Sequence, residues 1–281
     1  MNKTIFSILT IGLFLLSGLI VYPASSETVQ TTSTGTTLYV GGSGPSNYSS
    51  IKSAIENASD GDTVFVYDDS SPYYEAVGIS KSLRLIGENK YSTVIDSSGN
   101  ENVITIHNKQ NVEISQFTIQ NGVPEGISIY ESSNIIISDN IFKTNGNAIS
   151  CFEGGYITIT KNIISNNRAN GIFFQSVDGK NFVNGNSISN NDKFALTIRH
   201  TEIKITNNNI INNGPLSPII ETYFISGLQY PHFWDGNYWN IPRILPKPIF
   251  GSKVGDISPF NIMIEWDRNP AKEPYDIGGV D

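Results

Sequence analysis

Residues 125–147, EGISIYESSNIIISDNIFKTNGN, contain one full copy of a repeat that recurs along the middle of the chain. Isoleucines alternate with polar residues in it, as in Ile127-Ser128-Ile129, and a period of two is typical of a strand with one buried face. The pattern returns every 22 to 24 residues, in three registers that agree with one another. Their leading positions are Ile104, Ile127, Ile149, Ile172 and Leu196; Ile114, Ile137, Ile159, Val183 and Ile205; and Phe117, Asn140, Asn162, Asn186 and Asn208.

Each repeat has room for three short strands and for no crossover helix, which excludes βαβ units. Such strands must stack on their equivalents in the next repeat, so we expect an all-β parallel solenoid with about 22–24 residues per rung. The 31 asparagines fit its turns, because Asn tolerates left-handed backbone and can form side-chain ladders between stacked rungs. The asparagine excess therefore predicts structure and no chemistry.

Composition excludes several classes of protein. The chain has 281 residues with 26 acidic and 18 basic side chains, a net charge of −8, and this balance argues against a nucleic-acid partner. A single cysteine excludes a disulfide framework and a cysteine-based zinc cluster. We expect a globular protein with an ample apolar core.

The amino terminus has the order of a signal peptide. Lys3 precedes an apolar run, residues 5–21, and small residues follow up to Ser26, which predicts a signal peptide over residues 1–26 and a secreted or cell-surface protein. The alternative is an uncleaved membrane anchor, through which alone the protein would contact a membrane. A flexible spacer is predicted over residues 27–37, followed by a single β-helix domain over residues 38–281.

Both ends of a solenoid need caps, because they expose unpaired strand edges. Residues 50–58 predict a short amphipathic capping helix, and Gly61–Val66 should then start the first rung. The period is lost near residue 214, so residues 214–281 are interpreted as an irregular carboxy-terminal capping region. An aromatic group there is expected to cover the last rung: Tyr230, Phe233, Trp234, Tyr238 and Trp239.

Several motifs resemble those of the pectin-lyase-like right-handed parallel β-helix superfamily, particularly NosD-like β-helix proteins and archaeal secreted surface proteins. They include Tyr39-Val40-Gly41-Gly42, Leu85-Ile86-Gly87-Glu88-Asn89 and Gly236-Asn237-Tyr238-Trp239. The resemblance implies a right-handed coil. It also implies the range of roles that the fold hosts, from polysaccharide lyases to adhesins.

The NosD-like resemblance implies a copper-linked periplasmic role, which the residues themselves do not favour. Copper needs soft or imidazole ligands, and no two histidines lie at ligand spacing. We therefore expect no metal site of this kind.

Strand alternation also predicts which side chains face water. If Ile149 and Cys151 point inward, the next positions form one outward column across successive rungs: His107, Tyr130, Phe152, Gln175 and Arg199. The following positions form a second column: Asn108, Glu131, Glu153, Ser176 and His200. Cys151 is then a small buried hydrophobe and not a nucleophile.

Aromatic faces beside paired carboxylates are typical of a groove that binds glycans. The predicted ligand-binding residues are His107, Tyr130, Glu131, Phe152, Glu153 and Gln175. No catalytic residue is assigned, although Glu131, Glu153, Arg199 and His200 are candidates. The two glutamates could run retaining hydrolysis, or hold a calcium ion while Arg199 or His200 removes a proton; otherwise no cofactor is expected. Alternatively, both glutamates merely begin solvated turns.

The preferred interpretation is a secreted or surface binding module for polysaccharide or another cell-envelope component, without catalysis. Two alternatives stay open: a carbohydrate-active lyase or hydrolase that uses the glutamate pair, and a structural surface-layer protein. The oligomeric state is left open.

Overall fold

The computed structural model describes residues 35–214, 223–226, 232–240, 245–252 and 262–277. The predicted signal peptide lies outside the described residues, as does the predicted spacer except for residues 35–37. The described chain is a parallel β-solenoid whose rungs wind through three faces, with a single described helix, α1 (Ile51–Asn57). None of the described residues form a helix long and apolar enough to cross a membrane.

The first face consists of parallel strands in the order β3 (Val77–Ile79), β6 (Ile104–His107), β9 (Glu125–Ser138), β11 (Asn147–Thr160), β13 (Ile172–Gln175), β16 (Leu196–Arg199) and β19 (Tyr223–Ser226). Only the amino-terminal halves of β9 and β11 belong to it.

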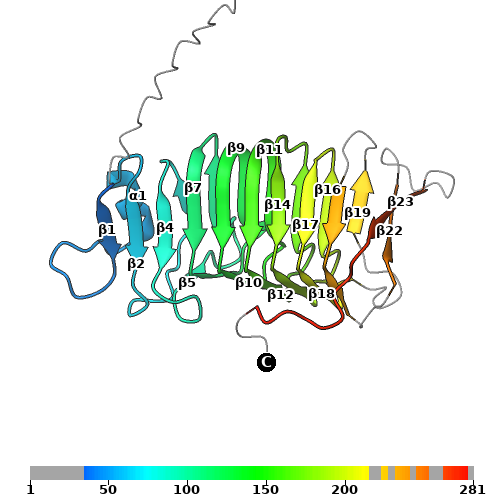
Figure 1. Ribbon diagram of the computed structural model, residues 1–281. Helices are drawn as coiled ribbons and strands as arrows, with labels where there is room; N and C mark the ends of the chain where they lie inside the picture. Colours follow the sequence, from blue (N-terminus) through cyan, green and yellow to red (C-terminus); the bar gives the residue numbers. More distant parts are fainter. Residues whose placement is uncertain (1–34, 215–222, 227–231, 241–244, 253–261, 278–281) are drawn as a thin grey trace, which may run out of the picture. The chain divides into compact units, whose positions relative to one another are not determined.

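The second face is drawn in front in Figure 1. It consists of β1 (Thr37–Val40), β2 (Thr63–Val66), β4 (Arg84–Gly87), β7 (Gln110–Ser115), the carboxy-terminal halves of β9 and β11, β14 (Asn181–Asn184), β17 (Ile203–Thr206) and β20 (His232–Asp235).

The third face is a separate sheet of β5 (Val94–Asp96), β8 (Thr118–Gln120), β10 (Ile141–Lys143), β12 (Ile163–Ser165), β15 (Ser187–Ser189), β18 (Asn209–Ile211) and β21 (Tyr238–Trp239). All its pairings are parallel.

The strand register confirms the predicted repeat. Ile127 pairs with Ile104 on one side and Ile149 on the other, and Ile137 pairs with Ile114 and Ile159. These side chains are fully buried, because alternation turns the same set of positions inward on every rung.

Side-chain ladders of asparagine fill two of the corners, as the sequence predicted. In the first ladder Asn140 Nδ2 donates to Asn162 Oδ1 at 3.2 Å, and Asn162 Nδ2 donates to Asn186 Oδ1 at 3.0 Å. In the second, Asn145 Nδ2 donates to Asn167 Oδ1 at 3.0 Å. These amides are fully buried, so the ladders supply partners for polar groups that water cannot reach.

The corner between the first and second faces differs from the prediction of separate short strands. It is formed by the predicted second column, whose members all have left-handed backbone with φ between 48° and 58°: Asn108, Glu131, Glu153, Ser176 and His200. One left-handed residue turns the chain without ending the ladder, so β9 and β11 each run on for 14 residues.

The amino-terminal cap is helix α1, as predicted. Ser50 caps it by accepting a hydrogen bond from Ser53 N, and Ile51, Ala54 and Ile55 are buried. The sheet begins earlier than predicted, because β1 pairs in parallel with β2. Thr37, the last residue of the predicted spacer, is thus the first residue of a strand.

The carboxy-terminal region contains one more rung than predicted. Tyr223 pairs with Leu196, His232 with Ile203, and Tyr238 with Asn209, although intervals of 27 and 29 residues replace the usual 22 to 24. β22 (Lys247–Ser252) and β23 (Ile262–Asp267) then form an antiparallel pair.

The predicted aromatic cap is confirmed in part. Trp234, Tyr238 and Trp239 are buried, with the two tryptophan rings 5.8 Å apart. Phe233 is instead 52% exposed, because it takes an outward position on β20. Tyr230 lies outside the described residues.

Candidate functional site

The predicted first column lies in register on the first face. Tyr130 pairs with His107 and with Phe152, and Gln175 pairs with Phe152 and with Arg199. Tyr130 is 39% exposed, and Phe152 and Gln175 are half-buried. The column therefore presents aromatic and polar side chains to solvent on adjacent rungs.

Ring contacts divide this surface into two aromatic pairs. The rings of His107 and Tyr130 lie 5.3 Å apart, and those of Phe152 and Phe173 lie 5.4 Å apart. The Arg199 guanidinium lies 5.3 Å from the Phe173 ring centroid. Phe173 was not among the predicted site residues, although its place two positions before Gln175 in the same strand puts it on the same outward side.

The two predicted carboxylates lie at the corner, on neighbouring rungs. Glu131 and Glu153 lie between two pairs of aligned residues, Tyr130 with Phe152 and Ser132 with Gly154, so their backbones are about 4.8 Å apart. Both side chains are exposed. Asn and Gly adopt left-handed backbone more readily than Glu does. The presence of glutamate at both positions therefore favours a functional role for these side chains.

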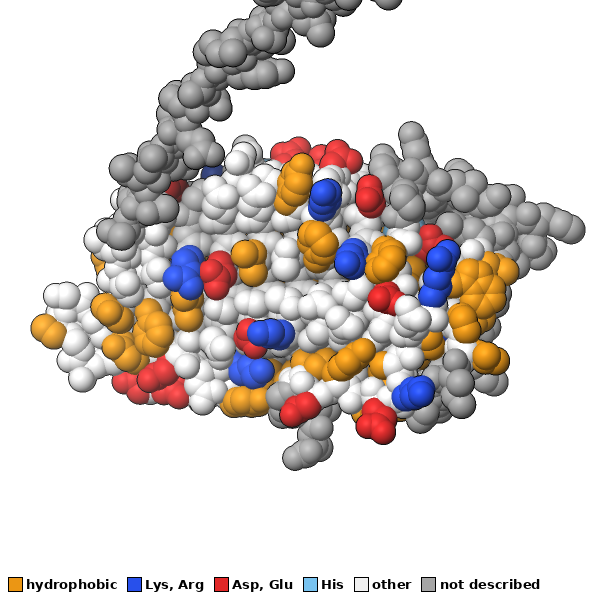
Figure 2. Space-filling view, viewed as in Figure 1, with side chains coloured by type: hydrophobic (Ala, Val, Ile, Leu, Met, Phe, Trp, Pro, Cys, Tyr) orange, Lys and Arg blue, Asp and Glu red, His pale blue; other side chains and the backbone are white. Residues whose placement is uncertain are grey.

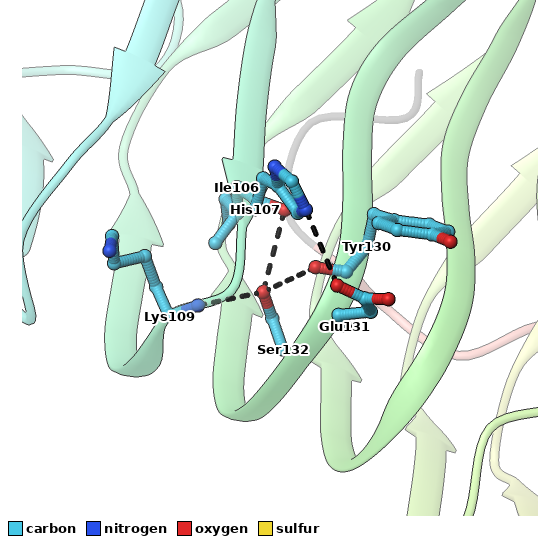
Figure 3. Close-up of polar contacts among 6 residues, drawn as sticks. All are labelled: Ile106, His107, Lys109, Tyr130, Glu131 and Ser132. Atoms are coloured by element: carbon cyan, nitrogen blue, oxygen red, sulfur yellow. Dashed lines mark hydrogen bonds and ion pairs between the residues drawn. The ribbon is translucent and has the colours of Figure 1, made fainter.

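Figure 3 shows that Glu131 reaches toward His107, with 3.4 Å between Glu131 Oε2 and His107 Nε2. Ser132 stabilises the turn below them: its Oγ donates to the Tyr130 carbonyl at 2.8 Å and accepts from Lys109 N at 3.1 Å. Because both partners are exposed, the Glu131–His107 contact adds little to stability and can open for a ligand.

The electrostatic field of the corner acts on Tyr130. The negative charge of Glu153, and then that of Glu131, raises the pKa of its phenol. The two carboxylates and the Tyr130 hydroxyl thus form one acidic cluster at the rim of the first face.

The other two catalytic candidates are not brought to this cluster. Arg199 and His200 lie two rungs beyond Glu153, at about 10 Å. Among the described residues, no group of three or more His, Cys, Asp or Glu side chains is arranged to hold a metal ion. A calcium ion at the glutamate pair would need most of its ligands from elsewhere, for example from a bound glycan.

Glu125 is a residue of this face that the sequence analysis missed. It begins β9 and is only 7% exposed, with Ser150 Oγ donating to its Oε2 and Asn147 Nδ2 to its Oε1 at 3.4 Å. Burial raises the pKa of its carboxyl, and these hydrogen bonds lower it by less. A buried acid with a raised pKa is suited to donating a proton.

A hollow of about 410 Å³ lies beside Glu125. Asn102, Pro124 and Glu101 help to line it, and Asn102 Oδ1 accepts a hydrogen bond from Glu125 N at 3.0 Å. Glu125 is six residues before Glu131 in one strand, a separation of about 20 Å, so these two carboxyls cannot act on the same bond.

Cys151 is fully buried and points inward, as predicted. Burial, with a smaller effect from the charge of Glu125, raises the pKa of its thiol. The thiolate that a nucleophile requires is therefore disfavoured.

Comparisons with known proteins agree with the fold. The family model described as "Right handed beta helix region" matches residues 102–230. No curated protein matches the chain.

Solved structures that are similar to the chain include a pectin methylesterase in complex with a hexasaccharide, with a TM-score of 0.43 and 14% identity, covering 85% of this chain and 90% of that one. Another is the pectin methylesterase PemA from Erwinia chrysanthemi, with a TM-score of 0.41 and 13% identity, covering 87% and 90%. Likenesses this remote carry no inference about activity, and the predicted likeness to NosD-like proteins stays a prediction. The match over residues 102–230 and the parallel stacking of the strands together show that the chain has the right-handed parallel β-helix fold.

Proposed function

We propose that this protein is a secreted or cell-surface binding module that holds a polysaccharide on its first face. The observation that carries the proposal is the column of Tyr130 and Phe152 beside the carboxylates of Glu131 and Glu153. A sugar ring has one apolar face that packs on an aromatic ring, and hydroxyls on its edge that hydrogen-bond to carboxylates.

The rung spacing supports binding to a polymer. Equivalent residues recur at about 4.8 Å along the solenoid, so a chain lying across the rungs meets similar groups repeatedly. His107 and Gln175, on either side of the two aromatic residues, extend the contact surface by a rung in each direction.

The decisive experiment measures retention of the full-length protein in gels that contain neutral or acidic polysaccharides, with and without calcium. Tyr130→Ala/Phe152→Ala should weaken retention by at least about tenfold. Tyr74→Ala, which removes an exposed tyrosine in the loop before β3, is the matched control and should leave retention unchanged. Equal retention of all three proteins would overturn the proposal for this face.

A lyase or hydrolase is the second candidate function, and Glu125 is the observation that favours it. Its raised pKa suits a general acid, and Glu101 lies on the adjoining rung, where its carbonyl accepts from Val123 N at 3.0 Å. Release of new sugar ends by the wild type, abolished in Glu125→Gln and kept in Glu131→Gln, would establish this function. Retention of the polysaccharide without any product would exclude it for that substrate.

A further inference from the structure

The second face carries an outward column of its own. Backbone pairing aligns, rung after rung, Arg84, Glu113, Ile136, Thr158, Phe182, Lys204 and Phe233. The neighbouring outward column of the same face is polar, as solvated solenoid surfaces are: Ser115, Ser138, Thr160, Asn184 and Thr206. Large apolar side chains are therefore concentrated along one line of this face.

Aromatic side chains on and beside this line are exposed. The exposed fractions lie between 38% and 57% for Tyr156, Phe182, Phe233 and Trp266. Figure 2 shows hydrophobic side chains interleaved with charged ones, both basic and acidic, in a row that crosses the strands of this face. An apolar row with charged neighbours is typical of a binding surface and unusual for a solvated face.

Three hollows follow one another along the row, of about 450, 200 and 350 Å³. Phe182 and Lys180 line both the first and the second, and Phe233 lines both the second and the third. Trp266 and Arg268 line the third. Because neighbouring hollows share their walls, a single extended molecule can occupy all three.

The charge of the row is opposite to that of the protein. Lys180, Lys204 and Arg268 line the hollows of a chain whose net charge is −8. Within the described part of the chain no carboxylate lies within ion-pair distance of these cations; Lys204 Nζ lies 5.1 Å from the Phe233 ring centroid. Glu202 lines the second hollow and Glu265 the third, and Arg84 is paired with Glu113 at 2.8 Å, so the lining of the three hollows carries a small excess of positive charge.

The spacing matches an extended sugar polymer. Phe182 and Phe233 are two rungs apart, about 10 Å, with Lys204 on the rung between them. Two sugar units of an extended polysaccharide span a similar length, so alternate rings could pack on the two phenyl faces while Lys204 pairs with a carboxylate between them.

We propose that this row, defined by Tyr156, Phe182, Phe233, Trp266, Lys180, Lys204 and Arg268, binds an extended acidic polysaccharide along the solenoid axis. This second site is separate from the site proposed on the first face. The rim of the first face is acidic, because it carries Glu131 and Glu153. The protein would then hold two segments of polymer, or two different polymers, on faces of opposite charge.

The test measures the affinity of the full-length chain for polygalacturonate and for its fully methyl-esterified form, which has the same backbone without the charge. Phe182→Ala/Phe233→Ala should weaken binding to polygalacturonate by about tenfold. Lys180→Gln/Lys204→Gln should weaken it similarly and should flatten its dependence on salt concentration. Tyr74→Ala, which removes an exposed tyrosine in the loop before β3, serves as the control and should leave this binding unchanged.

Unchanged affinity for polygalacturonate in both second-face variants would overturn the inference. This holds even if Tyr130→Ala/Phe152→Ala weakens retention of the protein by the polysaccharide that the first face binds. Equal affinity for the esterified polymer, without salt dependence, would overturn the acidic specificity. Concentration-dependent self-association that Phe182→Ala/Phe233→Ala abolishes would assign the row to a second copy of the chain and likewise overturn the inference. Because the side chains substituted on the second face are exposed, matching thermal unfolding midpoints will show that these variants are folded.

Discussion

Asn237 donates two hydrogen bonds to one oxygen of Asp267, from its backbone N–H and from Nδ2, each 3.0 Å long. Trp239 Nε1 donates a third to the same oxygen at 2.9 Å. Asn237 is the last asparagine of the first ladder, so Asp267 on β23 takes the place that the next asparagine would occupy. The antiparallel pair thus ends the solenoid by satisfying its last ladder donors.

Asp267→Ala should lower the free energy of unfolding by about 2–4 kcal/mol, because three buried donors lose their acceptor. Asp267→Asn keeps an acceptor oxygen and imitates a ladder residue, so its loss should be clearly smaller. Urea denaturation of both variants checks this expectation. Equal losses would mean that the acceptor is not what stabilises this end.

A second prediction concerns the left-handed corner. Glu131 has a φ of 48°, which costs a residue with a side chain about 1–2 kcal/mol relative to its preferred conformations. Glu131→Gly should therefore raise stability by about 0.5–1 kcal/mol, after allowance for the greater freedom of glycine in the unfolded chain. Glu131→Gln keeps the strain and should change stability little.

Calorimetry of the two Glu131 variants, run beside a polysaccharide retention assay, separates backbone strain from function. The proposed binding role requires Glu131→Gly to bind more weakly although it is more stable. If it binds as well as the wild type, glutamate at this corner has no part in recognition.

The sequence analysis predicted the register of the central rungs correctly, because the strand period of two leaves one choice for Ile127 and its equivalents. It missed the last rung for two physical reasons. Insertions stretch the interval from Ile203 to His232 to 29 residues, and His232 is a polar residue at an inward position of the ladder. The last rung therefore does not follow from the regular spacing of isoleucines in the sequence.

The sequence predicted only those residues of the candidate site whose outward direction follows from the alternation of side chains along a strand. The outward positions of Tyr130 and Phe152 follow from the period, whereas the burial of Glu125 depends on Ser150 and Asn147 from the next rung. The row on the second face follows from the same alternation as the first column. The sequence did not single out this row, because its apolar members lie among charged and polar ones and Phe233 falls where the aromatic cap was expected.

Glu125 predicts a dependence of stability on pH. Its pKa in the folded protein is raised above the ordinary value of 4.5, so the folded state binds more protons than the unfolded state between these two values. Its contribution to stability is thus fully present below pH 4.5 and is lost as the pH rises through the folded pKa. Glu125→Gln should flatten this part of the stability curve and make the protein more stable at neutral pH.

Denaturant midpoints measured across the pH range for the wild type and Glu125→Gln test this prediction. Glu101→Gln is the control, because its side chain is exposed, and it should leave the curve unchanged. A parallel loss of stability with rising pH in wild type and Glu125→Gln would show that another group is responsible.

The last prediction tests the acidic cluster at the rim of the first face. Because Glu153 and Glu131 both raise the pKa of Tyr130, Glu153→Gln and Glu131→Gln should each bring that pKa back toward 10. The measurement is an NMR titration of tyrosine ring carbons, with the Tyr130 resonance assigned by Tyr130→Phe. High salt should reproduce part of the change, since these charges are exposed and therefore screened. If neither substitution moves the titration, the carboxylates point away from the phenol, and a glycan could not contact the three groups together.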